Sequence, residues 1–201
     1  MTIIALEQLK DMSPADWIIS AAETDGWAKI AVSGPGGFSN YVRLLFVPDP
    51  SFPGQREIDV DFNRSGPSMP ERRQLRSAIR VLDDHTTTPG AYYFAIWVGN
   101  ADIEMPSPES IFSIPNRDYF LLYGQLDLVA SRSMATFPLD PGSLPDPAFI
   151  WPSDRSWVIA NDVDPHFATI GASAEAIDCL LRNGQIDTVR YGRDTDPPHY
   201  L

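Results

Sequence analysis

The sequence contains a single cysteine, Cys179, so it cannot form a disulfide within the chain. It also lacks an apolar run near the roughly 20 residues that a bilayer-spanning helix needs. Its longest apolar stretches are residues 17–22 and 91–99. The opening residues show neither the basic segment nor the small-residue cleavage pattern of a secretory signal. We therefore expect a soluble, cytoplasmic protein that makes no membrane contact.

Lysine is also scarce, since only Lys10 and Lys29 occur among 15 basic residues, against 27 acidic ones. The formal net charge of −12 is unevenly distributed: residues 1–100 carry 12 acidic and 9 basic side chains, and residues 101–201 carry 15 and 6. Nonspecific nucleic acid binding depends on basic side chains that neutralise phosphates, so nucleic acid is an unexpected partner. A basic protein partner suits this charge better.

With 201 residues, of which 43% are hydrophobic, the chain is long enough to bury a core as one domain. Strand-like runs outnumber helical ones and do not alternate strictly with them. This pattern predicts an α+β fold, with a mixed or mainly antiparallel sheet and about three helices packed on it. We expect a single domain over residues 1–192 and a loosely ordered tail over residues 193–201.

Three helices are predicted from capping residues and apolar spacing. The first spans about 14–23 and ends at the turn pair Asp25-Gly26. The second begins at a Ser68/Glu71 capping box and ends near His85. The third has Ser173 as its N-cap and Gly184 as a left-handed stop.

Strands are predicted where β-branched and aromatic residues cluster or alternate with polar ones. The Gly-rich residues 33–39 separate the first two runs and are expected to form a hairpin turn, because they lack the spacing of a phosphate-binding loop. Residues 138–153 contain five prolines and are expected to form a surface loop. The predicted strands are 27–33, 38–48, 56–62, 91–99, 118–124, 155–162 and 166–173.

The sequence offers little support for nucleophilic catalysis. It has no Gly-x-Ser-x-Gly motif, and Cys179 lies among Ala176, Leu180 and Leu181 of a predicted helix, which favours an inert, buried thiol. Trp97, Trp151 and Trp157 are expected in the core, with the lining of a ligand cleft as the alternative. No cofactor and no metal are assigned.

The most suggestive polar series lies in the turn at 161–166. Asp162, Asp164 and His166 would share one face of a continuing strand, and carboxylates with an imidazole suit metal binding or acid–base chemistry. Pro165 interrupts that strand, so a loop is the favoured interpretation. His85 or His199 could join such a site only through tertiary proximity.

Two further groups are candidates for partner or ligand contacts. Arg72, Arg76 and Arg80 recur at every fourth position and form a basic stripe on the second predicted helix. A solvated face is the favoured interpretation, with a phosphate, an acidic partner or the acidic second half of this chain as the alternatives. Asp154 and Arg155 could lie at the mouth of an aromatic cleft, and Trp97 is a candidate for its lining.

Four stretches carry a resemblance when they are taken in order: GGFSNYVRLLFVPDP, HTTTPGAYYFAIWVG, DYFLLYG and WPSDRSWVIANDVD. Together they resemble segments of a family of small actinobacterial proteins, over about residues 34–171. That family has no established activity, so the resemblance implies no role for any residue. The chain departs from the family pattern where WVGN replaces a Trp-Asp-Gly turn and where Ala172 replaces a second glycine.

Two functions remain as hypotheses. The first is a non-enzymatic, acidic interaction protein that binds a basic protein, as an immunity protein does with a toxin domain. The second is a small-ligand or metal-dependent enzyme that uses the 161–166 turn. A phosphate site on the arginine stripe is a weaker third possibility.

Overall fold

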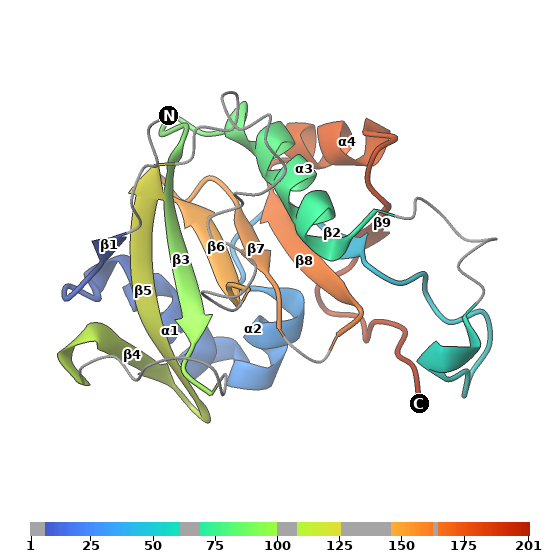
Figure 1. Cartoon of the computed structure of the whole chain (residues 1–201), viewed down its shortest axis with the longest axis horizontal. Coiled ribbons are helices and arrows are strands. Elements are labelled where there is room, and N and C mark those ends of the chain that lie inside the picture. The colour runs from blue at the N-terminus through green and yellow to red at the C-terminus, as the bar shows by residue number, and fades with distance from the viewer. Residues whose placement is uncertain (1–6, 61–68, 100–107, 126–145, 163–164) are drawn as a thin grey trace.

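The computed structural model describes residues 7–60, 69–99, 108–125, 146–162 and 165–201. In these ranges, one antiparallel sheet of nine strands runs through the molecule (Figure 1). Its order is β1-β5-β3-β6-β7-β8-β2-β9, and β4 pairs with β5 beside β1. The strands are β1 (Glu7–Gln8), β2 (Asn40–Leu45), β3 (Ala91–Trp97), β4 (Ile111–Ile114), β5 (Arg117–Gln125), β6 (Phe149–Pro152), β7 (Val158–Ala160), β8 (Phe167–Ala172) and β9 (Thr188–Tyr191).

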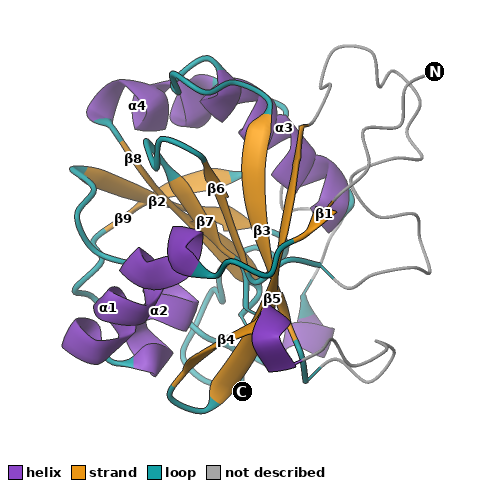
Figure 2. Ribbon diagram, turned by 90° about the vertical axis from the view of Figure 1, so that its left-hand side faces the viewer, coloured by secondary structure: helices purple, strands orange, loops and turns teal. Residues whose placement is uncertain are grey.

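Four α-helices of the described ranges cover the two faces of this sheet (Figure 2). They are α1 (Asp16–Asp25), α2 (Trp27–Ser33), α3 (Glu71–Asp83) and α4 (Ala174–Arg182). Three short 3-10 helices also occur: η1 (Ser13–Ala15) before α1, η2 (Glu57–Asp59) between β2 and α3, and η3 (Pro108–Ser110) before β4. Helices α1 and α2 pack on one face, and α3 and α4 pack on the other. The α+β prediction with an antiparallel sheet is confirmed, although the described ranges contain four α-helices instead of about three.

The alternation of side chains along each strand divides the core into two layers. Trp157 and Ile159 pack beneath α3 and α4, whereas Val158 and Ala160 face α1 and α2. This is the split that a period of two predicts for this segment. Trp151 and Trp157 are fully buried on opposite faces, so both belong to the core.

Several predicted elements are confirmed. The first helix begins and ends within two residues of its predicted bounds, and the strands predicted at 91–99, 118–124, 155–162 and 166–173 correspond to β3, β5, β7 and β8. Strand β2 occupies the centre of the run predicted at 38–48. The Ser173 side chain caps α4 by accepting a hydrogen bond from the Ala176 backbone N–H at 3.2 Å.

Other predictions are wrong. Residues 27–33 form α2 instead of a strand, so the glycine-rich residues 33–39 connect a helix to β2 and are not a hairpin turn. Residues 57–59 form a 3-10 helix, and β6 lies inside the stretch expected to be a surface loop. Helix α3 begins after Pro70 without a side-chain cap, and Ser68 lies outside the described residues. Gly184 has no left-handed conformation.

None of the helices in the described ranges combines the length and the apolarity that a membrane-spanning helix requires.

Candidate functional site

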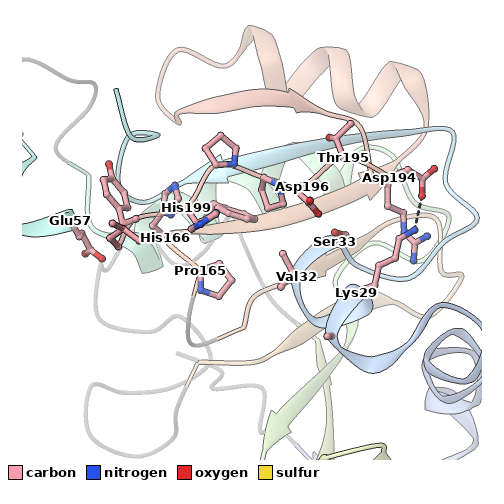
Figure 3. Close-up of a pocket in the computed structure, with 17 residues that line it drawn as sticks. Lys29, Val32, Ser33, Glu57, Pro165, His166, Asp194, Thr195, Asp196 and His199 are labelled. Carbon is pink, nitrogen blue, oxygen red and sulfur yellow. Dashed lines mark hydrogen bonds and ion pairs between the residues drawn. The ribbon is translucent and has the colours of Figure 1, made fainter. Parts of the chain in front are cut away.

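A cleft of about 890 Å³ lies between helix α2, the start of β8 and the C-terminal segment 193–201 (Figure 3). We call it the C-terminal cleft. His166 and His199 both line it, although they are 33 positions apart in the sequence. Val32, Phe167 and Tyr200 contribute apolar surface. The cleft therefore combines apolar walls with a few polar groups, as ligand-binding clefts commonly do.

The pairing of β2 with β8 places His166 in the cleft wall. Leu45 lies opposite Phe167, and just beyond this pair the His166 carbonyl accepts hydrogen bonds from the backbone N–H groups of Phe46 and Val47 at 3.0 and 3.2 Å. The chain then continues from Val47 to Asp49. The end of β2 therefore brings Asp49 beside the imidazole of His166.

Arg43, Asp49 and His166 form a partly buried polar network behind this wall. The Arg43 guanidinium donates two hydrogen bonds to the Asp49 carboxylate at 2.5 and 2.7 Å, and His166 Nε2 lies 3.2 Å from Asp49 Oδ1. Burial acts to raise the pKa of Asp49, but the hydrogen bonds from Arg43 and His166 outweigh burial and hold that pKa below its usual value. Asp49 is therefore a carboxylate at neutral pH.

Aromatic rings complete the surroundings of this network. The Arg43 guanidinium lies 4.9 Å from the centre of the Phe167 ring, and the His166 ring lies edge-on to Tyr200 with ring centres 4.8 Å apart. The Tyr200 hydroxyl donates a hydrogen bond to the Pro48 carbonyl oxygen. These contacts hold residues 48–49 and the C-terminal segment against the start of β8.

The positive charges that line the cleft are already paired. Lys29 donates to the Asp194 carboxylate at 2.6 Å. Arg193 donates to the Asp25 carboxylate at 2.5 Å and to the Gly34 carbonyl oxygen at 2.9 Å. Segment 193–201, expected to be loosely ordered, thus makes several specific contacts with α1, α2 and the loop that follows β2.

Asp162 lies in a different setting from His166. Its carboxylate pairs with the Arg117 guanidinium at 3.4 Å, and that guanidinium lies 4.3 Å from the centre of the Trp97 ring and 5.4 Å from that of Trp27. Asp162 and Trp97 therefore belong to a cluster around Arg117, and neither lines the C-terminal cleft. Asp164 lies outside the described residues.

Asp154 and Arg155 occupy the turn between β6 and β7. The Asp154 carboxylate accepts hydrogen bonds from the Thr86 hydroxyl at 2.8 Å and from the Thr87 backbone N–H and hydroxyl at 2.6 and 2.7 Å. Arg155, with a positive φ of 57°, donates to the Pro14 carbonyl oxygen at 3.4 Å and lies over the Trp17 ring. These residues fix a turn to neighbouring segments and do not line the C-terminal cleft.

The arginine stripe on α3 and Cys179 on α4 lie on the face of the sheet opposite to α1 and α2. Arg72 pairs with Asp146 at 2.9 Å, and burial, followed by the nearby charge of Arg80, lowers the pKa of Arg76. Cys179 is half-buried and accepts a hydrogen bond from Arg182 at 3.4 Å, so it is less buried than expected. Among the described residues, no group of three or more His, Cys, Asp or Glu side chains is arranged to hold a metal ion.

Of the described residues that the sequence singled out for chemistry, His166 lines the C-terminal cleft, and so does His199, which the sequence named as a residue that could join the site. Sequence reasoning missed Arg43, Asp49 and Tyr200. Asp49 and His166 are 117 positions apart, so no local spacing could have joined them. The one available signal was His199, a second histidine that required tertiary proximity.

Comparison with known proteins gave no match to a family model, to a curated protein or to a solved structure.

Proposed function

We propose that the protein is a non-enzymatic binding protein whose partner is a basic protein, in the manner of an immunity protein that neutralises a toxin domain. The observation that carries this proposal is the charge balance. The chain has a net charge of −12, and basic side chains near the cleft, including Lys29, Arg43 and Arg193, already pair with carboxylates of the chain. The surplus carboxylates therefore leave the surface negative, and such a surface attracts and orients a basic partner.

The contacts of the suggestive side chains support the same proposal. Asp154 binds Thr86 and Thr87, Asp162 pairs with Arg117, and His166 contacts Asp49. Each contact joins segments that are distant in the sequence, so each has a structural role. An enzyme would instead need several of these groups to converge on one reacting atom.

Affinity purification from the native host, with the intact chain as bait, tests this proposal. We expect a protein with more Lys and Arg than Asp and Glu to be retained at about 0.1 M salt and released at about 1 M, because the Debye length falls from about 10 Å to about 3 Å. Calorimetry with the purified partner should show affinity that falls with salt. Retention of only acidic or neutral proteins, or affinity that does not depend on salt, would contradict the proposal.

We also propose membership of the actinobacterial family that the sequence resembles. Two of the four motifs that carry the resemblance meet in space, because Asp154 of WPSDRSW binds the threonines of HTTTPG. Their shared use in one turn supports reading them together as one pattern. A profile built from sequences that contain both motifs should align with residues 34–171 of this chain, and failure to align beyond the motifs would contradict membership.

A second candidate function is acid–base chemistry on a small ligand in the C-terminal cleft. The observation that favours it is the Asp49–His166 contact at the cleft wall, since a carboxylate can orient an imidazole toward a ligand. A metabolite screen by thermal shift tests this candidate. A ligand that stabilises the native chain but not His166→Gln would support it, and the absence of any such ligand would count against it.

A further inference from the structure

We propose that the C-terminal cleft receives the cationic side chain of an arginine or lysine from the basic partner, held between Glu57 and Asp196. This inference rests on the proposed function and adds the contact site. Glu57 enters the cleft wall from η2 and Asp196 from the C-terminal segment, and Figure 3 shows the two histidines of the cleft between them.

The first argument is the charge that remains after internal pairing. Lys29 and Asp194 neutralise one another, and Arg193 is held by Asp25. Glu57 and Asp196 line the cleft, are exposed, and pair with no basic side chain of the described residues. An anionic ligand would have to displace Asp194 or Asp25 from its partner, whereas a cation finds two carboxylates available. The charge of the cleft therefore selects a cation.

The second argument is the chemistry of the walls. Tyr200 lines the cleft, and aromatic rings attract guanidinium and ammonium groups. The chain already uses this contact at Arg43, whose guanidinium lies 4.9 Å from the Phe167 ring centre. Burial, followed by the charges of Asp49 and Glu57, raises the pKa of Tyr200, so the charge of Glu57 acts on this ring.

The third argument identifies a protein as the source of the cation. Phe52, Ile58 and Leu201 are the exposed large hydrophobic residues of the described ranges, with 58%, 85% and 81% of their surface accessible. All three lie at the Glu57 end of the cleft. Phe52 and Ile58 belong to segment 51–58, and Leu201 is bound to that segment because its backbone N–H donates to the Gln55 carbonyl oxygen at 3.1 Å. Figure 1 shows these segments side by side. We call these three residues the apolar patch.

An apolar patch beside a cation site suits a folded or extended polypeptide better than a free amine. Exposed apolar groups of this kind mark protein contact surfaces when they gather together. The cleft volume of about 890 Å³ exceeds what one arginine side chain fills, so it also leaves room for neighbouring residues of the partner. The expected partner therefore presents a basic side chain flanked by apolar ones.

Peptide titration of the intact, nitrogen-15-labelled chain tests the inference. The probe is the pentapeptide acetyl-Leu-Gly-Arg-Gly-Leu-amide. A second peptide replaces Arg with citrulline, which has nearly the same shape but no charge, and a third replaces both Leu residues with Ser. We expect the first peptide to shift the amide signals of Glu57, His166 and His199, the citrulline peptide to bind at least fivefold more weakly, and the seryl peptide to bind about threefold more weakly.

Matched variants test the two carboxylates. Because an exposed ion pair contributes about 0.2–1 kcal/mol, Glu57→Gln with Asp196→Asn should weaken the arginine peptide about fivefold. The control is Glu7→Gln with Glu175→Gln, which removes the same charge at exposed positions on β1 and α4 that do not line the cleft. It should bind like the native chain. Amide spectra of both variants establish that each is folded.

Several results would overturn the inference. Equal binding of the arginine and citrulline peptides, or native affinity in the Glu57→Gln and Asp196→Asn variant, would remove the cation site. Equal binding of the leucyl and seryl peptides would remove the apolar patch and with it the assignment to a protein. If a basic host partner binds that variant as tightly as the native chain, the inference fails while the proposed function stands. If the arginine peptide binds the cleft but no basic host protein is retained, the cation site stands and the proposed function fails.

Discussion

Asp154 is a single residue whose contacts tie two distant turns together. Its carboxylate accepts hydrogen bonds from Thr86, from both the backbone and the side chain of Thr87, and from the Ser156 backbone N–H at 3.0 Å. Burial acts to raise the pKa of Asp154, but these hydrogen bonds outweigh it and hold the pKa well below its usual range. The charged form is therefore the one that the fold stabilises.

We predict that Asp154→Asn lowers the free energy of unfolding by about 1–2 kcal/mol at pH 7, because charge-assisted hydrogen bonds are lost at a partly exposed site. A depressed pKa contributes stability above the unfolded value of about 3.9, and this contribution disappears as the pH falls through the folded pKa. The difference between the native chain and the variant should therefore shrink in acid. Urea denaturation at neutral and acidic pH measures both effects. Glu23→Gln, an exposed change on α1, is the control, and an equal loss in that variant would contradict the prediction.

Arg43 and Asp49 form a partly buried ion pair whose loss also affects stability. The Arg43 side chain is only 6% exposed, and its replacement by Met leaves the Asp49 carboxylate, among its partners in the described ranges, with His166 alone. We predict a loss of about 3 kcal/mol for Arg43→Met, because an uncompensated buried charge is costly. The double variant with Asp49→Asn should recover part of that loss, as measured by urea denaturation. Strictly additive losses would show that the two side chains do not interact.

Among individual residues, the sequence predicted part of the candidate site. The series Asp162, Asp164 and His166 drew attention to the correct turn, and His166 does line the cleft. Its partner Asp49 follows a β-strand far upstream, and only the β2–β8 pairing brings the two together. The role of Asp162 was equally hidden, because Arg117 lies 45 positions away in the β4–β5 hairpin. Local spacing cannot report contacts that a sheet creates.

Among the elements, the strongly alternating strands and amphipathic helices were predictable, and the exceptions have physical reasons. Residues 27–33 are rich in Trp, Ile and Val, which favour strands, yet Ile30 and the half-buried Trp27 share one side of a helix and pack on the sheet. This tertiary contact outweighs their propensity. Strand β6 was hidden by Pro147 and Pro152, but Pro152 ends the strand, where the ladder loses little from a missing N–H.

Gly26 permits the sharp joint between α1 and α2. Its φ and ψ of 86° and 143° lie in a region that residues with a Cβ rarely adopt. We predict that Gly26→Ala lowers the free energy of unfolding by about 1–3 kcal/mol through backbone strain, although a Cβ there would meet no atom within 4 Å.

Gly184 provides the matched control for this element. A Cβ at Gly184 also meets nothing within 4 Å, and its φ is not left-handed, so Gly184→Ala should change stability by no more than about 0.5 kcal/mol. Thermal or urea denaturation of the two variants separates strain from crowding. Equal effects at both glycines would show that the conformation of Gly26 is not strained for alanine.

Across the whole molecule, several ion pairs join segments that are distant in the sequence. The pairs Arg193–Asp25 and Lys29–Asp194 connect the C-terminal segment to α1 and α2, and the hydrogen bond between His166 and Asp49 connects the start of β8 to the segment after β2. The acidic surplus remains outside these pairs. The sequence predicted that surplus and its sign. Which side chains pair depends on the order of the strands in the sheet, and no single stretch of sequence determines that order.

The C-terminal segment 193–201 was expected to be loosely ordered, yet it makes specific contacts with the rest of the molecule. Removing residues 193–201 would break the Arg193–Asp25 pair and the hydrogen bond from the Tyr191 hydroxyl to the Thr195 carbonyl oxygen at 2.9 Å. It would also expose His166, whose side chain is 6% accessible. Because breaking a largely buried pair leaves one charge uncompensated, we predict a loss of at least about 2 kcal/mol in unfolding free energy. The control is Asp196→Asn with His199→Gln, which keeps the segment and should unfold like the native chain. A truncated chain of native stability would show that the segment contributes nothing to the fold, and that only the residues before it form the stable unit.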